Sequence, residues 1–199
     1  MKQTTTRRFG MLLMPLLLTL AFSQVLHAQT AYKLGPKPTM DLYGTSTLHN
    51  WEMSAHSFAG SAQITLTSDN QLSSINGLTV MLPVHNLKSE HDGMNDNAYE
   101  ALKADTYRDI VFKLTSSKIV SSGGNKYQIT AYGNLTIAGV SKQITLTATG
   151  QVNADGSIGV SGTVPLKLSE FNIERPSFML GTMSVGDALT LNYSLVLVK

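Results

Sequence analysis

An alternation of apolar and polar residues over residues 127–148 constrains the fold of this chain more than any other feature. From Tyr127 to Ile137 every second residue is apolar or glycine, and the residues between them are Gln, Thr, Tyr and Asn. A period of two is typical of a β-strand that buries one face. The same alternation resumes after Ala138 and Gly139 and continues to Ala148. The stretch therefore predicts a β-hairpin.

The register of this hairpin follows from the position of its turn. A turn centred on Ala138 and Gly139 puts all the apolar residues of both strands on one face. The expected apolar pairs are Ile137 with Val140, Gly133 with Ile144, and Ala131 with Leu146. The opposite face pairs polar residues, such as Asn134 with Gln143. An antiparallel sheet with one apolar and one solvated face follows, and the rest of the chain must cover the apolar face.

Most of the remaining sequence has the same strand-like pattern. Further strands are predicted at residues 41–48, 50–57, 58–67, 72–84, 110–120, 157–168 and 187–198. About eight strands at hairpin spacing, with no βαβ pattern, predict an all-β fold: an antiparallel up-and-down barrel or a sandwich. Residues 29–37 are predicted to be an irregular lead-in because of Pro36 and Pro38. Residues 169–184 are predicted to be a loop with a helical turn.

One short helix is expected in the mature chain. Residues 91–105 carry Met94, Ala98 and Ala101 at helical spacing, and Asn97 with Glu100 three positions later resembles a capping box. A single short helix in an all-β chain is expected to cover one end of a barrel or sandwich.

Residues 1–28 have the layout of a secretory signal peptide. Lys2, Arg7 and Arg8 precede an apolar run over residues 11–22, and the small residue Ala28 suits cleavage. The apolar run is short for a membrane span, so a membrane-spanning protein is not expected. The prediction is a mature domain of residues 29–199 in the periplasm or secreted from the cell. With no cysteine, its core must stabilise the fold without disulfides.

Removal of the signal peptide changes the charge balance. Without Lys2, Arg7 and Arg8, 12 basic residues stand against 13 acidic ones, and the formal charge is −1. No run of Lys and Arg remains to neutralise phosphates, so nucleic acid is not an expected partner.

Metal and catalytic sites are not predicted. His49 and His56 are seven residues apart, and His85 and His91 are six apart, which matches no recognised metal-ligand spacing. There is no G-x-S-x-G motif, and the absence of cysteine excludes a thiol nucleophile. We therefore expect no catalytic residues, no bound metal and no enzyme activity.

Three stretches of the sequence carry distinctive motifs. A tyrosine followed by an I-x-F strand is present as Tyr107, Ile110 and Phe112, and the G-x-S-x-x-H-x-W pattern runs from Gly44 to Trp51. The hairpin begins at Tyr127 and has the pattern G-x-L-T-I-x-G-V-x-K over residues 133–142. In these three stretches the sequence resembles the YceI-like family of secreted, lipocalin-like β-barrels. The family usually has proline after the tyrosine, where this chain has Arg108. The resemblance covers nearly all of residues 39–199.

The resemblance implies an elongated barrel that binds an apolar chain, such as a polyisoprenoid or an isoprenoid quinone. No other cofactor is expected. We expect the ligand to contact large apolar side chains, the small residues in the middle of the hairpin, and a loop that covers the mouth. The predicted contacts are Trp51, Met53, Phe58, Phe112, Leu114, Ala131, Gly133, Phe171, Phe178, Met179 and Tyr193.

Two alternatives remain open from the sequence. A non-catalytic structural or adhesion domain with a fully packed core needs the same alternating strands as a lipid binder. An outer-membrane barrel is disfavoured by the shortness of most strands and by the lack of aromatic girdles. The sequence is compatible with a homodimer, but it defines neither the oligomeric state nor the ligand.

Overall fold

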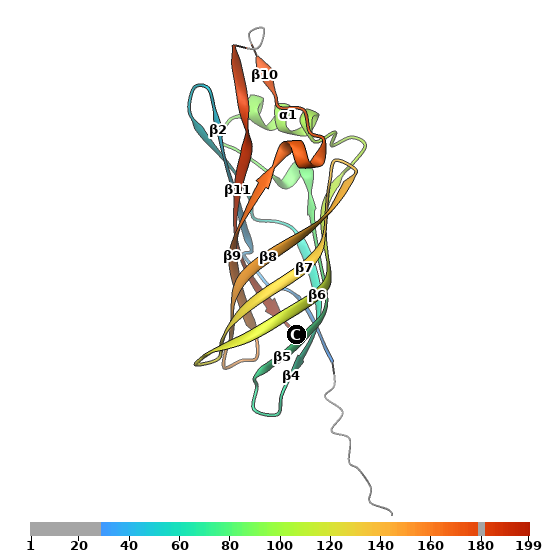
Figure 1. Ribbon diagram of the computed structural model, residues 1–199, viewed down its shortest axis with the longest axis vertical. Coiled ribbons are helices and arrows are strands. Elements are labelled where there is room, and N and C mark those ends of the chain that lie inside the picture. The colour runs from blue at the N-terminus through green and yellow to red at the C-terminus, as the bar shows by residue number, and fades with distance from the viewer. Residues whose placement is uncertain (1–28, 179–181) are drawn as a thin grey trace, which may run out of the picture.

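The chain folds into an elongated β-barrel with the helix α1 (Asp92–Ala101) at one end (Figure 1). A computed structural model describes residues 29–178 and 182–199, without the side chains of Phe178 and Met183. The predicted signal peptide and Met179 lie outside the described residues. The strands are β1 (Thr30–Leu34), β2 (Thr39–Ser46), β3 (Asn50–Ala55), β4 (Ala59–Leu66), β5 (Leu72–Pro83), β6 (Asp109–Gly123), β7 (Lys126–Ile137), β8 (Val140–Val152), β9 (Ile158–Lys167), β10 (Ser177–Phe178) and β11 (Met183–Val198). The helices are α1 (Asp92–Ala101) and two short 3₁₀ helices, η1 (Val84–Asn86) and η2 (Leu168–Phe171).

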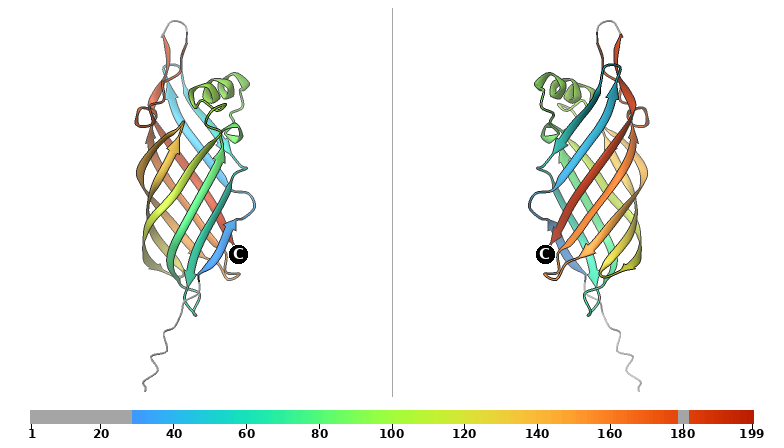
Figure 2. Two further views of the ribbon diagram at one scale, coloured as in Figure 1. Left: turned by 90° about the vertical axis from the view of Figure 1, so that its right-hand side faces the viewer. Right: turned by 90° about the vertical axis from the view of Figure 1, so that its left-hand side faces the viewer.

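The barrel is a closed antiparallel ring. Its strands follow the order β1-β4-β5-β6-β7-β8-β9-β11, and β11 pairs back with β1. Figure 2 shows the tilted strands of this wall from two sides, with α1 near one end and the β4–β5 turn at the other. The predicted antiparallel barrel is confirmed.

Two strands of the barrel wall each consist of two segments: β1 with β2, and β3 with β4. β1 and β2 pair with the same edge of β11, with Lys33 opposite Val198 and Thr39 opposite Ser194. Between them residues 35–38 leave the ladder. β4 pairs with β1, and β3 pairs with β2, so β3 and β4 form a second interrupted strand. With each interrupted pair counted as one strand, neighbours in sequence are neighbours in the wall, which is the predicted up-and-down order.

The prediction of an irregular lead-in at residues 29–37 is wrong for its first part. Thr30–Leu34 is strand β1, which closes the barrel between β4 and β11. Tyr32 at its centre is buried inside the barrel. Pro36 and Pro38 lack an N–H donor and interrupt the ladder only after Leu34. The proline signal marks a break between two strands rather than a segment without structure.

The central hairpin has the predicted register. Ile137 pairs with Val140, Ala131 pairs with Leu146, and the other predicted pairs are also present. Ala138 and Gly139 have φ angles of 48° and 79°. Positive φ at both central residues is the geometry of a two-residue type I′ turn, whose twist matches that of the flanking strands. Along β7 the apolar residues are buried and the polar residues between them are exposed or half-buried.

The helix lies within the predicted range but begins differently from the prediction. Its N-cap residue is His91, and Asn97 lies inside the helix, so the predicted capping box at Asn97 is wrong. Asn95 in the first turn is buried, and its Oδ1 accepts hydrogen bonds from the backbone N–H of Ser89 at 2.6 Å and from the Ser89 hydroxyl at 3.0 Å. These bonds attach the start of α1 to the segment before it.

The barrel wall is apolar on its inner face and mainly polar on its outer face. This arrangement is opposite to that of an outer-membrane barrel, whose outward face is apolar. No helix within residues 29–178 and 182–199 is long and apolar enough to cross a membrane.

Candidate ligand-binding cavity

The barrel encloses a cavity of about 460 Å³. Inward side chains of β2, β3, β5, β6, β7, β8, β9 and β11 line it, and nearly all of them are apolar. Leu42, Val80, Leu135, Ile144 and Leu191 represent these strands at the cavity wall. A volume of this size lies within the range of small-molecule sites, which is about 300–1,000 Å³. The barrel is therefore hollow in its middle rather than packed throughout.

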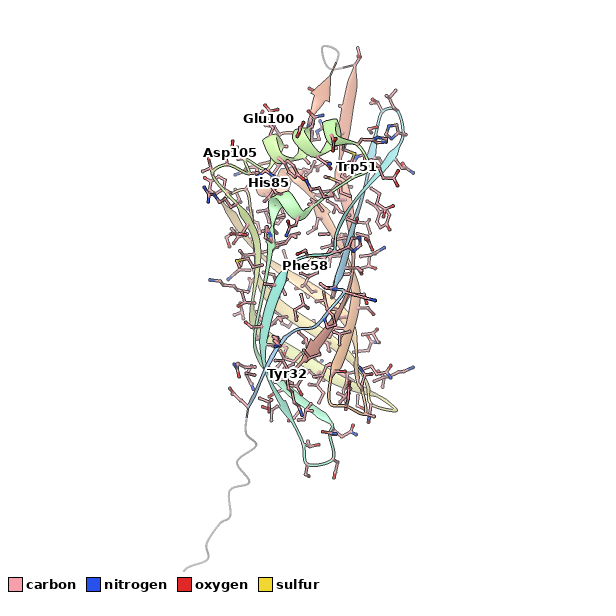
Figure 3. All side chains as sticks on the ribbon, turned by 180° about the vertical axis from the view of Figure 1, so that it is seen from behind. Tyr32, Trp51, Phe58, His85, Glu100 and Asp105 are labelled. Carbon is pink, nitrogen blue, oxygen red and sulfur yellow. The ribbon has the colours of Figure 1, made fainter. Side chains whose placement is uncertain are left out.

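The end of the barrel away from α1 is solid. Tyr32, Ile64, Tyr127 and Ile158 belong to one buried cluster there. The Tyr32 hydroxyl donates a hydrogen bond to the Gly156 carbonyl at 3.1 Å. Figure 3 shows Tyr32 near this end of the molecule, far from the helix that carries Glu100. We call this part of the barrel the closed end.

A second tyrosine fixes the closed end through its hydroxyl. The Tyr127 hydroxyl accepts a hydrogen bond from the backbone N–H of Leu72 at 3.0 Å and donates one to Gln71 Oε1 at 2.6 Å. Gln71 in turn donates to Asn125 Oδ1 at 2.8 Å. Buried polar groups are stable only when they are paired in this way. The closed end thus combines apolar packing with a fully paired polar network.

Polar side chains line the cavity at the end near α1. They come from the β2–β3 turn, from α1 and the residue before it, from the end of β9 and from the start of β11, and we call this end the mouth. The members are Ser46, His49, His91, Asn97, Lys167 and Ser184. An apolar tube with polar groups at one end suits a molecule with an apolar chain.

Helix α1 covers part of the mouth. Met94, Ala98 and Ala101 on one of its faces line the cavity. The Tyr99 hydroxyl shares its single proton between the carbonyls of Leu87 at 3.0 Å and His85 at 3.2 Å. The prediction that the helix covers one end of the barrel is confirmed. The helical spacing of these three residues was the signal by which they could also have been predicted as lining residues.

The η2 segment is attached to β11 at the same end. The Asp187 carboxylate accepts hydrogen bonds from the backbone N–H of Ser169 at 2.8 Å and from its hydroxyl at 2.7 Å. These bonds hold the pKa of Asp187 below its usual value. Phe171 of η2 is only 1% exposed and lines the cavity. It is therefore a buried part of the wall.

Trp51 can lie in the wall of the cavity near the mouth because its cross-strand neighbour is glycine. Gly44 lies opposite Trp51 in the β2–β3 pair, and a Cβ at Gly44 would overlap the indole ring. The indole Nε1–H donates to the Thr45 carbonyl at 3.0 Å. The spacing of Gly44 and Trp51 in the sequence thus sets the position of a large aromatic side chain at the cavity.

The room expected at Gly133 is already filled. A Cβ at Gly133 would lie 2.5 Å from Cζ of the Phe112 ring, and Gly133 does not line the cavity. The glycine lets the ring of Phe112 lie against the backbone of β7, so the ring and not the glycine faces the cavity. Ala131, two residues earlier on β7, does line it.

The structure brings most of the predicted contact residues to one cavity. Those that line it are Trp51, Met53, Phe112, Leu114, Ala131, Phe171 and Tyr193. Phe58 does not line it: this residue lies between β3 and β4 and is half-buried against the core. The side chain of Phe178 and all of Met179 lie outside the described residues. Contact of any of these residues with a ligand stays a prediction.

Metal ligands do not gather in the described part of the chain. Residues 29–178 and 182–199 contain no group of three or more His, Cys, Asp or Glu side chains that could hold a metal ion.

The sequence as a whole identifies the family. The profile of the YceI-like domain matches residues 40–197. The chain belongs to the YceI-like family. The predicted family is therefore confirmed, and the match extends from β2 to the end of β11.

Solved structures of similar proteins share the barrel. BcnA from Burkholderia cenocepacia is 22% identical, with a TM-score of 0.63 over 80% of this chain and 95% of that chain. A polyisoprenoid-binding domain from Saccharophagus degradans implicated in plant cell wall breakdown is 11% identical, with a TM-score of 0.60 over 83% of this chain and 97% of that one. A YceI protein from Campylobacter jejuni is 26% identical, with a TM-score of 0.51 over 70% and 81% of the two chains. No curated protein matches the sequence.

Proposed function

We propose that this YceI-like protein binds an apolar, isoprenoid-like lipid inside its barrel and sequesters or carries it. The observation that carries the proposal is the cavity of about 460 Å³, lined almost entirely by apolar side chains and bordered by polar ones at one end. Burial of a lipid chain against such a wall is favourable by about 25 cal/mol per Å² of apolar surface removed from water. A polyisoprenoid or an isoprenoid quinone fits this description.

The comparisons support the same class of ligand. The Saccharophagus degradans domain, which is described as polyisoprenoid-binding, has the same fold. The elongated lining, from Leu48 in the β2–β3 turn to Leu197 near the closed end, suits a chain better than a compact molecule.

The proposal includes a location and a chemical role. The sequence of residues 1–28 supports export, with the mature protein in the periplasm or outside the cell. The role is binding without catalysis, because the inner wall offers a lipid mainly apolar contacts and few polar groups to take part in a reaction. A structural or adhesion domain with a packed core is the competing function, and a cavity of this size speaks against it.

The test is extraction of the protein purified from its native host with organic solvent, followed by mass spectrometry. We expect an isoprenoid lipid in near-stoichiometric amount. Ala131→Trp should remove most of it, because Ala131 lines the cavity and the indole would occupy the ligand's space. Ala188→Trp on the exposed face of β11 is the control and should retain the lipid. A lipid-free wild-type protein, or equal retention by both variants, would contradict the proposal.

A further inference from the structure

Among the described residues of the cavity wall below the mouth, Tyr193 carries a hydroxyl group whereas its neighbours are apolar. Its neighbours on the inward face of β11 are Leu189, Leu191, Leu195 and Leu197. Tyr193 pairs with Met40 of β2, which lies six residues from Ser46 at the mouth, and this separation corresponds to about 20 Å along a strand. It packs against the buried clusters of both halves of the barrel, so it stands between the open cavity and the closed end.

Gly162 leaves room for the phenol ring of Tyr193 because it has no side chain. Gly162 lies opposite Tyr193 in the β9–β11 pair, and a Cβ at Gly162 would be 2.5 Å from the phenol oxygen and 2.8 Å from Cζ. The ring therefore lies across the backbone of β9 and reaches β8. Gly162 pairs with Ala148 on β8, where the β8–β9 ladder reaches its mouth-side end.

The hydroxyl has unused hydrogen-bonding capacity. Its contact with the Thr147 carbonyl is 3.5 Å long, at the outer limit for a hydrogen bond. A phenol can donate one hydrogen bond and accept others. Burial raises the pKa of Tyr193 to about 12, so the group is a neutral donor at every physiological pH.

We infer that the Tyr193 hydroxyl determines specificity by hydrogen-bonding a neutral oxygen, a carbonyl or a hydroxyl, which the lipid carries into the inner part of the cavity. The inference rests on the proposed function and adds the orientation of the ligand: its oxygen-bearing end enters first. Lys167 is the one lysine or arginine among the described lining residues, and it lies near the mouth. An anionic head group that reached Tyr193 would therefore have no lysine or arginine near it to pair with.

The test compares three isoprenoid probes. Farnesol carries a hydroxyl, ubiquinone-2 carries ring carbonyls, and β-farnesene is a hydrocarbon without oxygen. Their affinities are measured by displacement of a fluorescent apolar dye from lipid-stripped mature protein, for the wild type, for Tyr193→Phe and for Tyr132→Phe. Tyr132 on the outer face of β7 is exposed, so its variant is the matched control.

We expect Tyr193→Phe to bind farnesol or ubiquinone-2 about 3- to 10-fold more weakly, the usual effect of losing one neutral hydrogen bond. The affinity for β-farnesene should stay within about twofold, and Tyr132→Phe should change none of the three. Equal weakening of all three probes, or no change in any, would overturn the inference. Failure of the wild type to bind any probe would instead overturn the proposed function, and this inference with it.

Discussion

The two ends of the barrel are built from the same alternating strands but differ in how they are filled. At the closed end, side chains pack against one another, and Tyr32 and Tyr127 make hydrogen bonds to loops that close the barrel. At the mouth, the apolar side chains face open space, and α1 is held by the hydroxyl of Tyr99 and by Asn95. The difference indicates that stability is concentrated at the closed end, and under the proposed function the mouth is the end at which a ligand would enter and leave.

The largest expected difference between the ends comes from truncation of matched isoleucines. Ile64 at the closed end is 0% exposed, whereas Ile144 is half-buried and lines the cavity. Ile64→Ala should lower the free energy of unfolding by about 2–5 kcal/mol, because packed neighbours lose their contacts. Ile144→Ala in lipid-free protein should cost about 1 kcal/mol, since its side chain already borders empty space. Urea denaturation measures both, and equal losses would remove the distinction between the ends.

The hydrogen bonds of Tyr127 give the next effect. Tyr127→Phe leaves the buried backbone N–H of Leu72 without its hydroxyl partner. The expected loss is about 1–3 kcal/mol of unfolding free energy, the penalty for an unsatisfied buried donor. Lipid content should not change, because Tyr127 does not line the cavity. Thermal unfolding and lipid extraction of the same sample test this, and a stable variant that has lost its lipid would contradict the assignment of Tyr127 to the closed end.

The matching substitution at the mouth should act on kinetics more than on stability. Tyr99→Phe removes the hydroxyl that donates to the carbonyls of Leu87 and His85. These groups are near solvent, so the cost to stability should be only about 0.5–1 kcal/mol. A less constrained α1 should release the bound lipid several-fold faster, as measured by transfer to lipid-free vesicles. An unchanged release rate would mean that α1 does not limit access to the cavity.

The smallest expected effect is a loss of stability at alkaline pH that comes from ionisation of Tyr193. Burial raises the pKa of Tyr193 to about 12, above the ordinary tyrosine value of 10.0. A raised folded pKa favours the neutral phenol, so its contribution to stability is complete below pH 10 and is lost as the pH rises toward 12. The absorbance of tyrosinate near 295 nm should show a late step in the wild type that is missing in Tyr193→Phe. A difference spectrum that titrates near pH 10 would contradict the buried position of the phenol.

The sequence predicted the parts of the fold that depend on local periodicity. The register of the central hairpin followed from the alternation on either side of Ala138 and Gly139, because a one-residue shift would expose every apolar side chain. The strand at Thr30–Leu34 was missed, because it is short and its partners, β4 and β11, are distant in sequence. The nearby prolines led to the prediction of an irregular segment, whereas the strand depends on pairing with residues distant in sequence, which periodicity does not reveal.

The cavity was harder to predict than the fold. Alternation shows which side chains point inward, but not whether they meet in the centre. Gly133 illustrates the limit: its lack of a side chain implied open space, yet the Phe112 ring from the neighbouring strand fills it. Gly162 gives the opposite result, since it allows the Tyr193 ring to lie across β9 in a residue that lines the cavity. In both cases the use of the space is decided by a residue from another strand.

Photocrosslinking tests the central claim most directly. An isoprenoid analogue with a diazirine in its chain would be bound to lipid-stripped mature protein and irradiated, and the labelled peptides would be mapped residue by residue by mass spectrometry. The account predicts labels on Ile144 and Leu146, which line the cavity, and none on Thr145, which is exposed between them. Labels confined to the outward residues of β8, or spread evenly over both faces, would contradict a lipid held inside the barrel.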